Sequence, residues 1–114
     1  MPALSIKRVY DEPSAHDGMR VLVDRLWPRG LTREKAAVEL WLKDVAPSPG
    51  LRTWFDHRED RFEAFAERYR AELSTNPAVA ELRALARKRK VTLVYGAKDP
   101  AINHAVVLEA WLKA

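Results

Sequence analysis

The sequence of 114 residues contains no cysteine and only four glycines. Without cysteine the chain cannot form a disulfide, present a thiolate nucleophile or hold a metal through sulfur. The absence suits a reducing compartment, and we expect a cytoplasmic protein. The few glycines form no Gly-rich phosphate-binding loop and no Gly-x-Ser-x-Gly elbow, which excludes the nucleotide-binding and hydrolase sites that depend on those motifs.

Long apolar stretches are also lacking. The N-terminal residues have no apolar core of the kind found in a secretory signal. No apolar run approaches the roughly 18 residues that a membrane-spanning helix needs, so we expect no membrane partner. His16, His57 and His104 are far apart and show no metal-binding spacing. We therefore expect neither a metal nor a cofactor.

Apolar and basic residues are abundant. Hydrophobic residues make up 47% of the sequence, enough for the core of a single domain that spans residues 1–114. Lysine and arginine total 20 against 16 acidic residues, for a formal net charge of +4. This charge favours anionic partners in general, whether a nucleic acid or a small phosphorylated or carboxylated ligand. The sequence carries no signal for an oligomeric state.

Apolar runs and helical stripes alternate along the chain. Continuous apolar runs at Met19–Asp24 and Val91–Tyr95 are typical of strands covered on both faces. We expect another strand at Ile6–Tyr10, and at Val38–Val45 the alternation favours a strand, although a helical face also fits. The expected helices are a short one capped by Thr32, a turn at Leu51–Phe55, a long one over Glu59–Leu73, one from Pro77 after the cap Asn76, and one from Pro100 after Asp99.

Strands interleaved with helices in this order predict an α/β fold. Because two strands are expected to be buried on both faces, we expect a small sandwich with a mainly parallel sheet and helices on both faces. The sequence has no internal repeat, linker or low-complexity tract.

Polar residues gather directly after the two buried strands, in the loops Asp24–Gly30 and Gly96–His104. In open parallel sheets, ligands bind beyond the carboxyl ends of the strands, so these loops meet if the two strands are neighbours. The ligand-binding candidates are Arg25, Trp27, Arg29, Lys98 and Asn103, and the structural or site-supporting candidates are Asp24, Trp41 and Lys43.

The residue types in these loops predict a particular chemistry. Guanidinium groups donate paired hydrogen bonds to planar or tetrahedral anions, so Arg25 and Arg29, together with Lys98, indicate a small anionic metabolite. His104 can titrate near neutrality and transfer a proton, with Asp99 to orient it, which makes these two residues the catalytic candidates. The predicted function is an enzyme or sensor of such a metabolite.

Each of these residues also has a purely structural interpretation. Asp99 can cap the last helix, and its carboxylate would then occupy the positive end of that helix. Asp24 can form an ion pair with Arg25 that holds the loop. Asn103 and His104 can satisfy loop carbonyls. The four tryptophans fit a core better than a ligand platform.

The alternative function is a nucleic-acid-associated accessory protein. The segment 87–90 is entirely basic and could contact phosphates, although solvated cations that complement the negative end of a helix explain it better. The sequence shows no recognisable nucleic-acid module, so this function ranks second. A third possibility is a structural partner in a larger assembly, which a large exposed apolar patch would favour.

Several motifs resemble a known family in both order and spacing. They are Asp-Gly-x-Arg-Val-Leu-Val-Asp-Arg-Leu-Trp-Pro-Arg-Gly at 17–30, Trp-Leu-Lys-Asp-Val-Ala-Pro-Ser at 41–48, Leu-Arg-x-Trp-Phe at 51–55, and the 95–104 loop with Lys98-Asp99 and Asn103-His104. Over nearly the whole chain the sequence resembles the YeaO-like proteins, a bacterial family with a domain of unknown function. The resemblance implies a compact cytoplasmic α/β domain and no known reaction.

Overall fold

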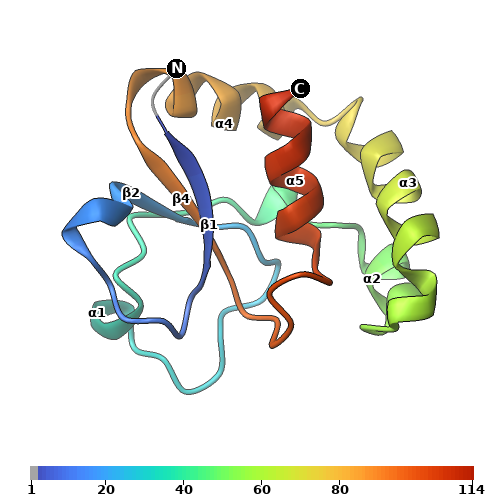
Figure 1. Ribbon diagram of the computed structural model, residues 1–114, viewed down its shortest axis with the longest axis horizontal. Coiled ribbons are helices and arrows are strands. Elements are labelled where there is room, and N and C mark those ends of the chain that lie inside the picture. The colour runs from blue at the N-terminus through green and yellow to red at the C-terminus, as the bar shows by residue number, and fades with distance from the viewer. Residues whose placement is uncertain (1–2) are drawn as a thin grey trace.

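The structure, a computed structural model, describes residues 3–114. Within them, four strands form one sheet in the order β1-β4-β2-β3, and every pairing is parallel (Figure 1). The strands are β1 (Leu4–Arg8), β2 (Met19–Leu22), β3 (Leu40–Trp41) and β4 (Val91–Tyr95). The predicted α/β class and the parallel sheet are confirmed.

Helices connect the strands largely where the sequence places them. The α-helices are α1 (Arg33–Ala36), α2 (Pro49–Phe55), α3 (Phe62–Leu73), α4 (Pro77–Lys88) and α5 (His104–Lys113), and the 3₁₀ helices are η1 (Ala15–Asp17), η2 (Lys43–Val45) and η3 (Glu59–Arg61). Thr32 caps α1 and Asn76 caps α4, as predicted. None of the helices formed by residues 3–114 has the length and apolarity that crossing a membrane requires.

Three strands differ from the sequence prediction. β2 ends at Leu22, two residues before the predicted end at Asp24. β1 begins and ends two residues earlier than expected, because its pairing with β4 stops where Arg8 lies opposite Tyr95. The segment Val38–Val45 contains a strand of only two residues, β3. The amide of Leu42 still donates to the carbonyl of Leu22 in β2 at 2.9 Å, but the chain then turns into η2.

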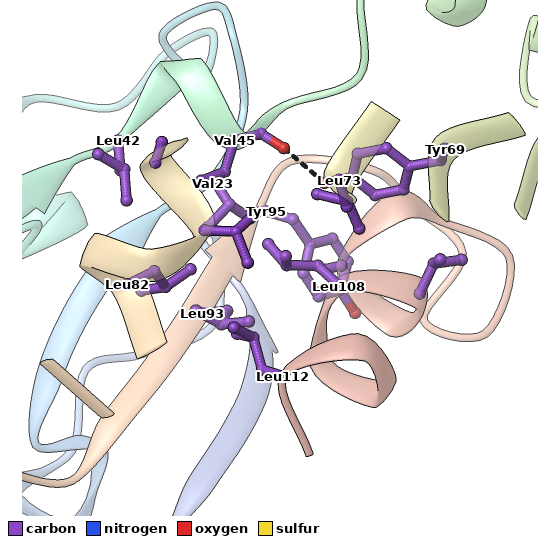
Figure 2. Close-up of a cluster of buried hydrophobic side chains, with 14 of the residues drawn as sticks. Val23, Leu42, Val45, Tyr69, Leu73, Leu82, Leu93, Tyr95, Leu108 and Leu112 are labelled. Carbon is purple, nitrogen blue, oxygen red and sulfur yellow. Dashed lines mark hydrogen bonds between the residues drawn. The ribbon is translucent and has the colours of Figure 1, made fainter. Parts of the chain in front are cut away.

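Most of the core lies on one face of the sheet, against α3, α4 and α5. Figure 2 shows Leu93 and Tyr95 of β4 packed with Leu82 of α4 and Leu108 of α5. Leu82, Leu93 and Leu108 are fully buried. The hydroxyl of Tyr69 on α3 donates to a main-chain carbonyl, that of Val45, at 2.6 Å. The helices on this face therefore hold the loops beyond the strands in fixed positions.

The other face of the sheet has a thinner cover. Its apolar cluster joins Leu22 and Val94 to Ala36 of the short helix α1, with Trp27 and Trp41 packed against it. Beside this cluster the buried side chains of Asp17 and Arg20 form an ion pair of 2.8 Å. Helices therefore lie on both faces of the sheet. Among the α-helices formed by residues 3–114, α1 is the one that packs on this second face (Figure 1).

Candidate functional site

A cavity of about 580 Å³ lies beyond the carboxyl ends of β2 and β4. The two strands are direct neighbours, with Val21 opposite Leu93 and Leu22 opposite Val94, so their following loops meet as the sequence predicts for neighbouring strands. The cavity is completed by the turn at Ala46, by α2 and by the N-terminus of α5. A concave site at this edge of a parallel sheet is the expected position for a ligand.

Asp24 joins the strand ends to the last helix. Its Oδ2 accepts a hydrogen bond from the amide of Gly96 at 2.8 Å, and its Oδ1 lies 3.0 Å from Nε2 of His104, the first residue of α5. A Cβ on residue 96 would lie 3.0 Å from the same Oδ2, so glycine permits this close approach. The carboxylate therefore fixes three segments of the cavity wall relative to one another.

The imidazole of His104 is held by two acceptors. Besides Oδ1 of Asp24, the carbonyl oxygen of Val23 lies 3.1 Å from Nε2. Because both neighbours of this nitrogen are acceptors, Nε2 carries a proton. In the structure the Asp24 carboxylate lies against His104 rather than against Arg25.

Arg25 and Asp24 each leave one buried atom without a hydrogen bond. The Nη2 atom of Arg25 donates to the carbonyls of Ala46 and Pro47, both at 3.3 Å. Its Nε atom and Oδ1 of Asp24 are the two buried side-chain atoms in residues 3–114 that have no hydrogen-bond partner. Buried polar atoms are almost always bonded, so two exceptions on adjacent residues of one cavity call for an explanation.

Further cations surround the cavity. Arg52 projects from α2 and Lys98 from the loop after β4, and both are exposed. Neither forms an ion pair within the part of the chain that the structure describes. In residues 3–114 no group of three histidine or acidic side chains is arranged to hold a metal ion. The cavity thus offers cationic donors rather than metal ligands.

The start of α5 corrects the prediction for Asp99. This carboxylate does not cap the helix: its Oδ1 accepts from the amides of Ala101 and Ile102 in a local turn. The cap is Asn103, whose Oδ1 accepts from Val106 and whose Nδ2 donates to the carbonyl of Asp99. Because both polar ends of the Asn103 side chain are engaged, we interpret it as a support of the cavity wall.

Replacing Asn103 by alanine should lower the free energy of unfolding by about 1–2 kcal/mol, because a helix cap is lost at a buried position. Urea denaturation measures this. Asn76→Ala removes the corresponding cap of α4, which lies outside the cavity, and serves as the matched control. Both variants lose the stability that a helix cap provides. If the affinity for a ligand falls in Asn103→Ala and not in Asn76→Ala, the loss of affinity comes from the change in the cavity wall.

Four sequence-predicted residues lie outside the cavity. Trp27 turns to the opposite face of the sheet, where Nε1 donates to the carbonyl of Leu31 at 2.8 Å and the ring packs edge-on against Trp41 at 5.5 Å. Arg29 is exposed, and its carbonyl accepts from the Tyr10 hydroxyl. The remaining two, Trp41 and Lys43, stack with each other, with Nζ 4.8 Å from the ring centroid. Trp41 supports the site indirectly, since its Nε1 donates to the main-chain carbonyl of Asp24.

Sequence reasoning missed the wall that α2 and α3 contribute. Arg52, Phe55 and His57 come from or directly follow α2, and Phe65 comes from α3. None of them is close in sequence to the two polar loops. The one signal was the motif Leu-Arg-x-Trp-Phe, in which a single exposed arginine stands among apolar residues.

Known proteins similar to this chain were found over almost its whole length. The profile of a protein family described as the inactive DUF488-N3 subclade matches residues 3–114. The chain is 47% identical over 103 residues to the uncharacterized protein Rv3073c of Mycobacterium tuberculosis (strain ATCC 25618 / H37Rv), which covers 90% of this chain and 87% of the relative. It is 41% identical over 112 residues to the uncharacterized protein YeaO of Escherichia coli (strain K12), which covers 97% of each. No solved structure matches the chain.

Proposed function

The chain belongs to the family described as the inactive DUF488-N3 subclade and is similar to the YeaO protein of Escherichia coli, and from this premise we propose that its cavity binds a small anionic metabolite. The anion would be a phosphate or a carboxylate. The description of the family as inactive supports binding over a chemical transformation of the ligand. As part of the same proposal we place the protein in the cytoplasm, which the lack of cysteine suits.

The observation that carries this proposal is the set of donors without partners around one cavity. Arg25 holds the wall with one nitrogen and leaves Nε unbonded, while Arg52 and Lys98 reach the same space without a carboxylate to neutralise them. Cations gathered in a concave site with apolar walls attract an anion more strongly than cations spread over a surface. A bound anion would pair with the exposed side chains of Arg52 and Lys98.

In this proposal His104 forms part of the cavity wall. Its Nε2 lies 3.1 Å from the carbonyl oxygen of Val23 and 3.0 Å from Oδ1 of Asp24, and these two oxygens fix the orientation of the ring. The same arrangement, with one ring nitrogen engaged, is compatible with the acid–base role suggested by the sequence. The family description leads us to propose that His104 only contacts the ligand.

The double variant Arg52→Gln/Lys98→Gln should bind phosphate or carboxylate ligands about tenfold or more weakly, since each lost hydrogen bond to a charged group removes about 1.5–3 kcal/mol before solvent screening. A thermal-shift panel of phosphate, sulfate, nucleotides, sugar phosphates and carboxylates identifies the anion. A ligand at 100 times its Kd should add about 2.7 kcal/mol of stability. Calorimetric titration then compares the variants.

The matched control is a double variant of the basic segment at the end of α4, Arg87→Gln/Lys88→Gln. It removes the same charge from exposed residues at the opposite end of β4 from the cavity. We expect it to bind the anion as the native chain does. Equal losses in the two double variants would mean that net charge, and not the cavity, attracts the anion, and a silent panel would also overturn the proposal.

The second candidate, a nucleic-acid-associated protein, rests on that same basic segment. Arg87 and Lys88 are exposed in the last turn of α4, and Arg89 forms only a long ion pair of 3.7 Å with Glu39. If the chain binds DNA or RNA there, retention should fall steeply with salt and weaken in the Arg87→Gln/Lys88→Gln variant. The two candidates therefore depend on different ends of the molecule.

A further inference from the structure

The cavity wall is mostly apolar, in contrast to its charged rim. Phe55 and Phe65 stack with ring centroids 4.2 Å apart and lie in the wall from the side of α2 and α3. Ile102 adds apolar surface beside α5, and Leu26 projects at the mouth, where it is 59% exposed. An exposed leucine next to an apolar cavity continues that apolar surface to the outside.

Several neutral and acidic polar groups of the wall are already engaged within the protein. The side chain of Asn103 caps α5 and donates to Asp99, and Oδ1 of Asp99 accepts two amides. Asp24 is bonded to Gly96 and paired with His104. A ligand body rich in hydroxyls would therefore lose hydrogen bonds to water and find few replacements, which is unfavourable.

The size of the cavity also favours a ligand with an apolar body over a bare anion. A volume of about 580 Å³ lies within the roughly 300–1,000 Å³ typical of sites for small organic molecules. An inorganic phosphate or sulfate at the cations would fill a small part of it and leave the apolar wall in contact with water. Burial of that wall by the ligand would add affinity that a bare anion cannot supply.

We infer that the ligand is an amphiphilic anion, a carboxylate or phosphate monoester with an apolar body. The anionic group lies among Arg25, Arg52 and Lys98, and the body lies against Phe55, Ile102 and Leu26. This inference rests on the proposed anion binding and adds the chemistry of the rest of the ligand. It distinguishes an acid with an alkyl or aryl body from a sugar phosphate.

A homologous series tests the inference directly. Acetate, butyrate, hexanoate and octanoate carry one anionic group and differ only in apolar length, and methyl, butyl and hexyl phosphate repeat the series with the other head group. Titrated against the native chain, the affinity should rise by up to about fourfold for each methylene that becomes buried. The steeper of the two series names the head group. Ribose 5-phosphate, with a polar body, should bind no better than inorganic phosphate.

Leu26→Ser tests the apolar part without touching a charge. The side chain is mostly exposed, so the fold should be unaffected, which thermal unfolding without ligand checks. We expect octanoate or hexyl phosphate to bind several-fold more weakly and acetate or methyl phosphate to bind unchanged.

The possible outcomes separate this inference from the proposed function. If short and long members bind equally, and the Arg52→Gln/Lys98→Gln variant weakens both, the cavity binds anions but the inference of an apolar body is wrong. Tighter binding of ribose 5-phosphate than of butyl phosphate would overturn it in the same way. If no member of either series binds but a nucleotide or sugar phosphate of the thermal-shift panel does, the inference of an apolar body is wrong; if no anion of the panel or of the two series binds, the proposed function itself fails.

Discussion

Replacing Asp17 by alanine is expected to lower the free energy of unfolding by about 3–5 kcal/mol. The buried carboxylate accepts hydrogen bonds from Arg20 at 2.8 Å, from the amide of Ser14 at 3.0 Å and from Lys7 at 3.1 Å. Without it the guanidinium of Arg20, whose side chain is only 4% exposed, stays buried with no opposite charge. An uncompensated buried charge is among the most destabilising changes that one substitution can make.

The same residue predicts a dependence on pH. Burial alone would raise the pKa of the Asp17 carboxyl, but the Ser14 amide and the cations of Arg20 and Lys7 outweigh burial and lower that pKa below its usual 3.8. Because the pKa is lower in the folded state, the carboxylate stabilises the fold fully above pH 3.8, and this stabilisation is lost as pH falls through the folded-state pKa. The stability difference between the native chain and Asp17→Ala should therefore shrink below about pH 4.

Urea denaturation from pH 7 to pH 3 measures both effects. Asp60→Ala is the control, since it removes an exposed carboxylate paired only with the exposed Arg58 and should leave stability nearly unchanged. A loss for Asp17→Ala no greater than that of the control would show that water reaches Arg20 and compensates it. The interpretation that the buried guanidinium of Arg20 depends on the Asp17 carboxylate would then be wrong.

This network illustrates what the sequence could not reveal. Asp17 lies in a segment rich in turn residues, and its carboxylate becomes buried only because Arg20 points to the same face of the sheet three residues later. Strands β2 and β4, in contrast, were predictable, since an unbroken apolar run has few alternatives to a covered strand. Local patterns thus gave the elements, while the partners of buried charges depended on the folded arrangement.

For the candidate site, the sequence predicted the place in the fold but not all of the residues that line it. Polar loops after two neighbouring strands meet in any parallel sheet, and the cavity lies there. The sequence predicts Asp99 as the cap of α5, but the structure uses Asn103, because Asp99 accepts the amides of its own turn. Arg29 was assigned to the site by its place in the loop, but Trp27 packs on the far face of the sheet and Arg29 lies exposed outside the cavity. Arg52 reaches the cavity through tertiary packing of α2.

Replacing Asp24 by alanine is expected to lower the free energy of unfolding by about 3 kcal/mol, because the Gly96 amide loses its acceptor and the His104 ring loses the carboxylate beside it. The same change should weaken anion binding, because β2, β4 and α5 are no longer held together around the cavity. Asp24→Asn is the informative comparison. The asparagine amide has a single oxygen, which can accept from Gly96 or from His104 but not from both, so about half of the stability loss should be recovered.

The two Asp24 variants should then act on binding in opposite directions. Asparagine keeps the shape of the wall and removes a negative charge from a site proposed to attract anions, so Asp24→Asn should bind the anion at least as tightly as the native chain. Alanine removes the charge and the shape together, and its affinity should fall. Calorimetric titration of both variants with one anion decides the matter. If Asp24→Asn loses affinity as severely as Asp24→Ala, the charge of the carboxylate is itself required, which would favour a ligand that presents a cation to Asp24.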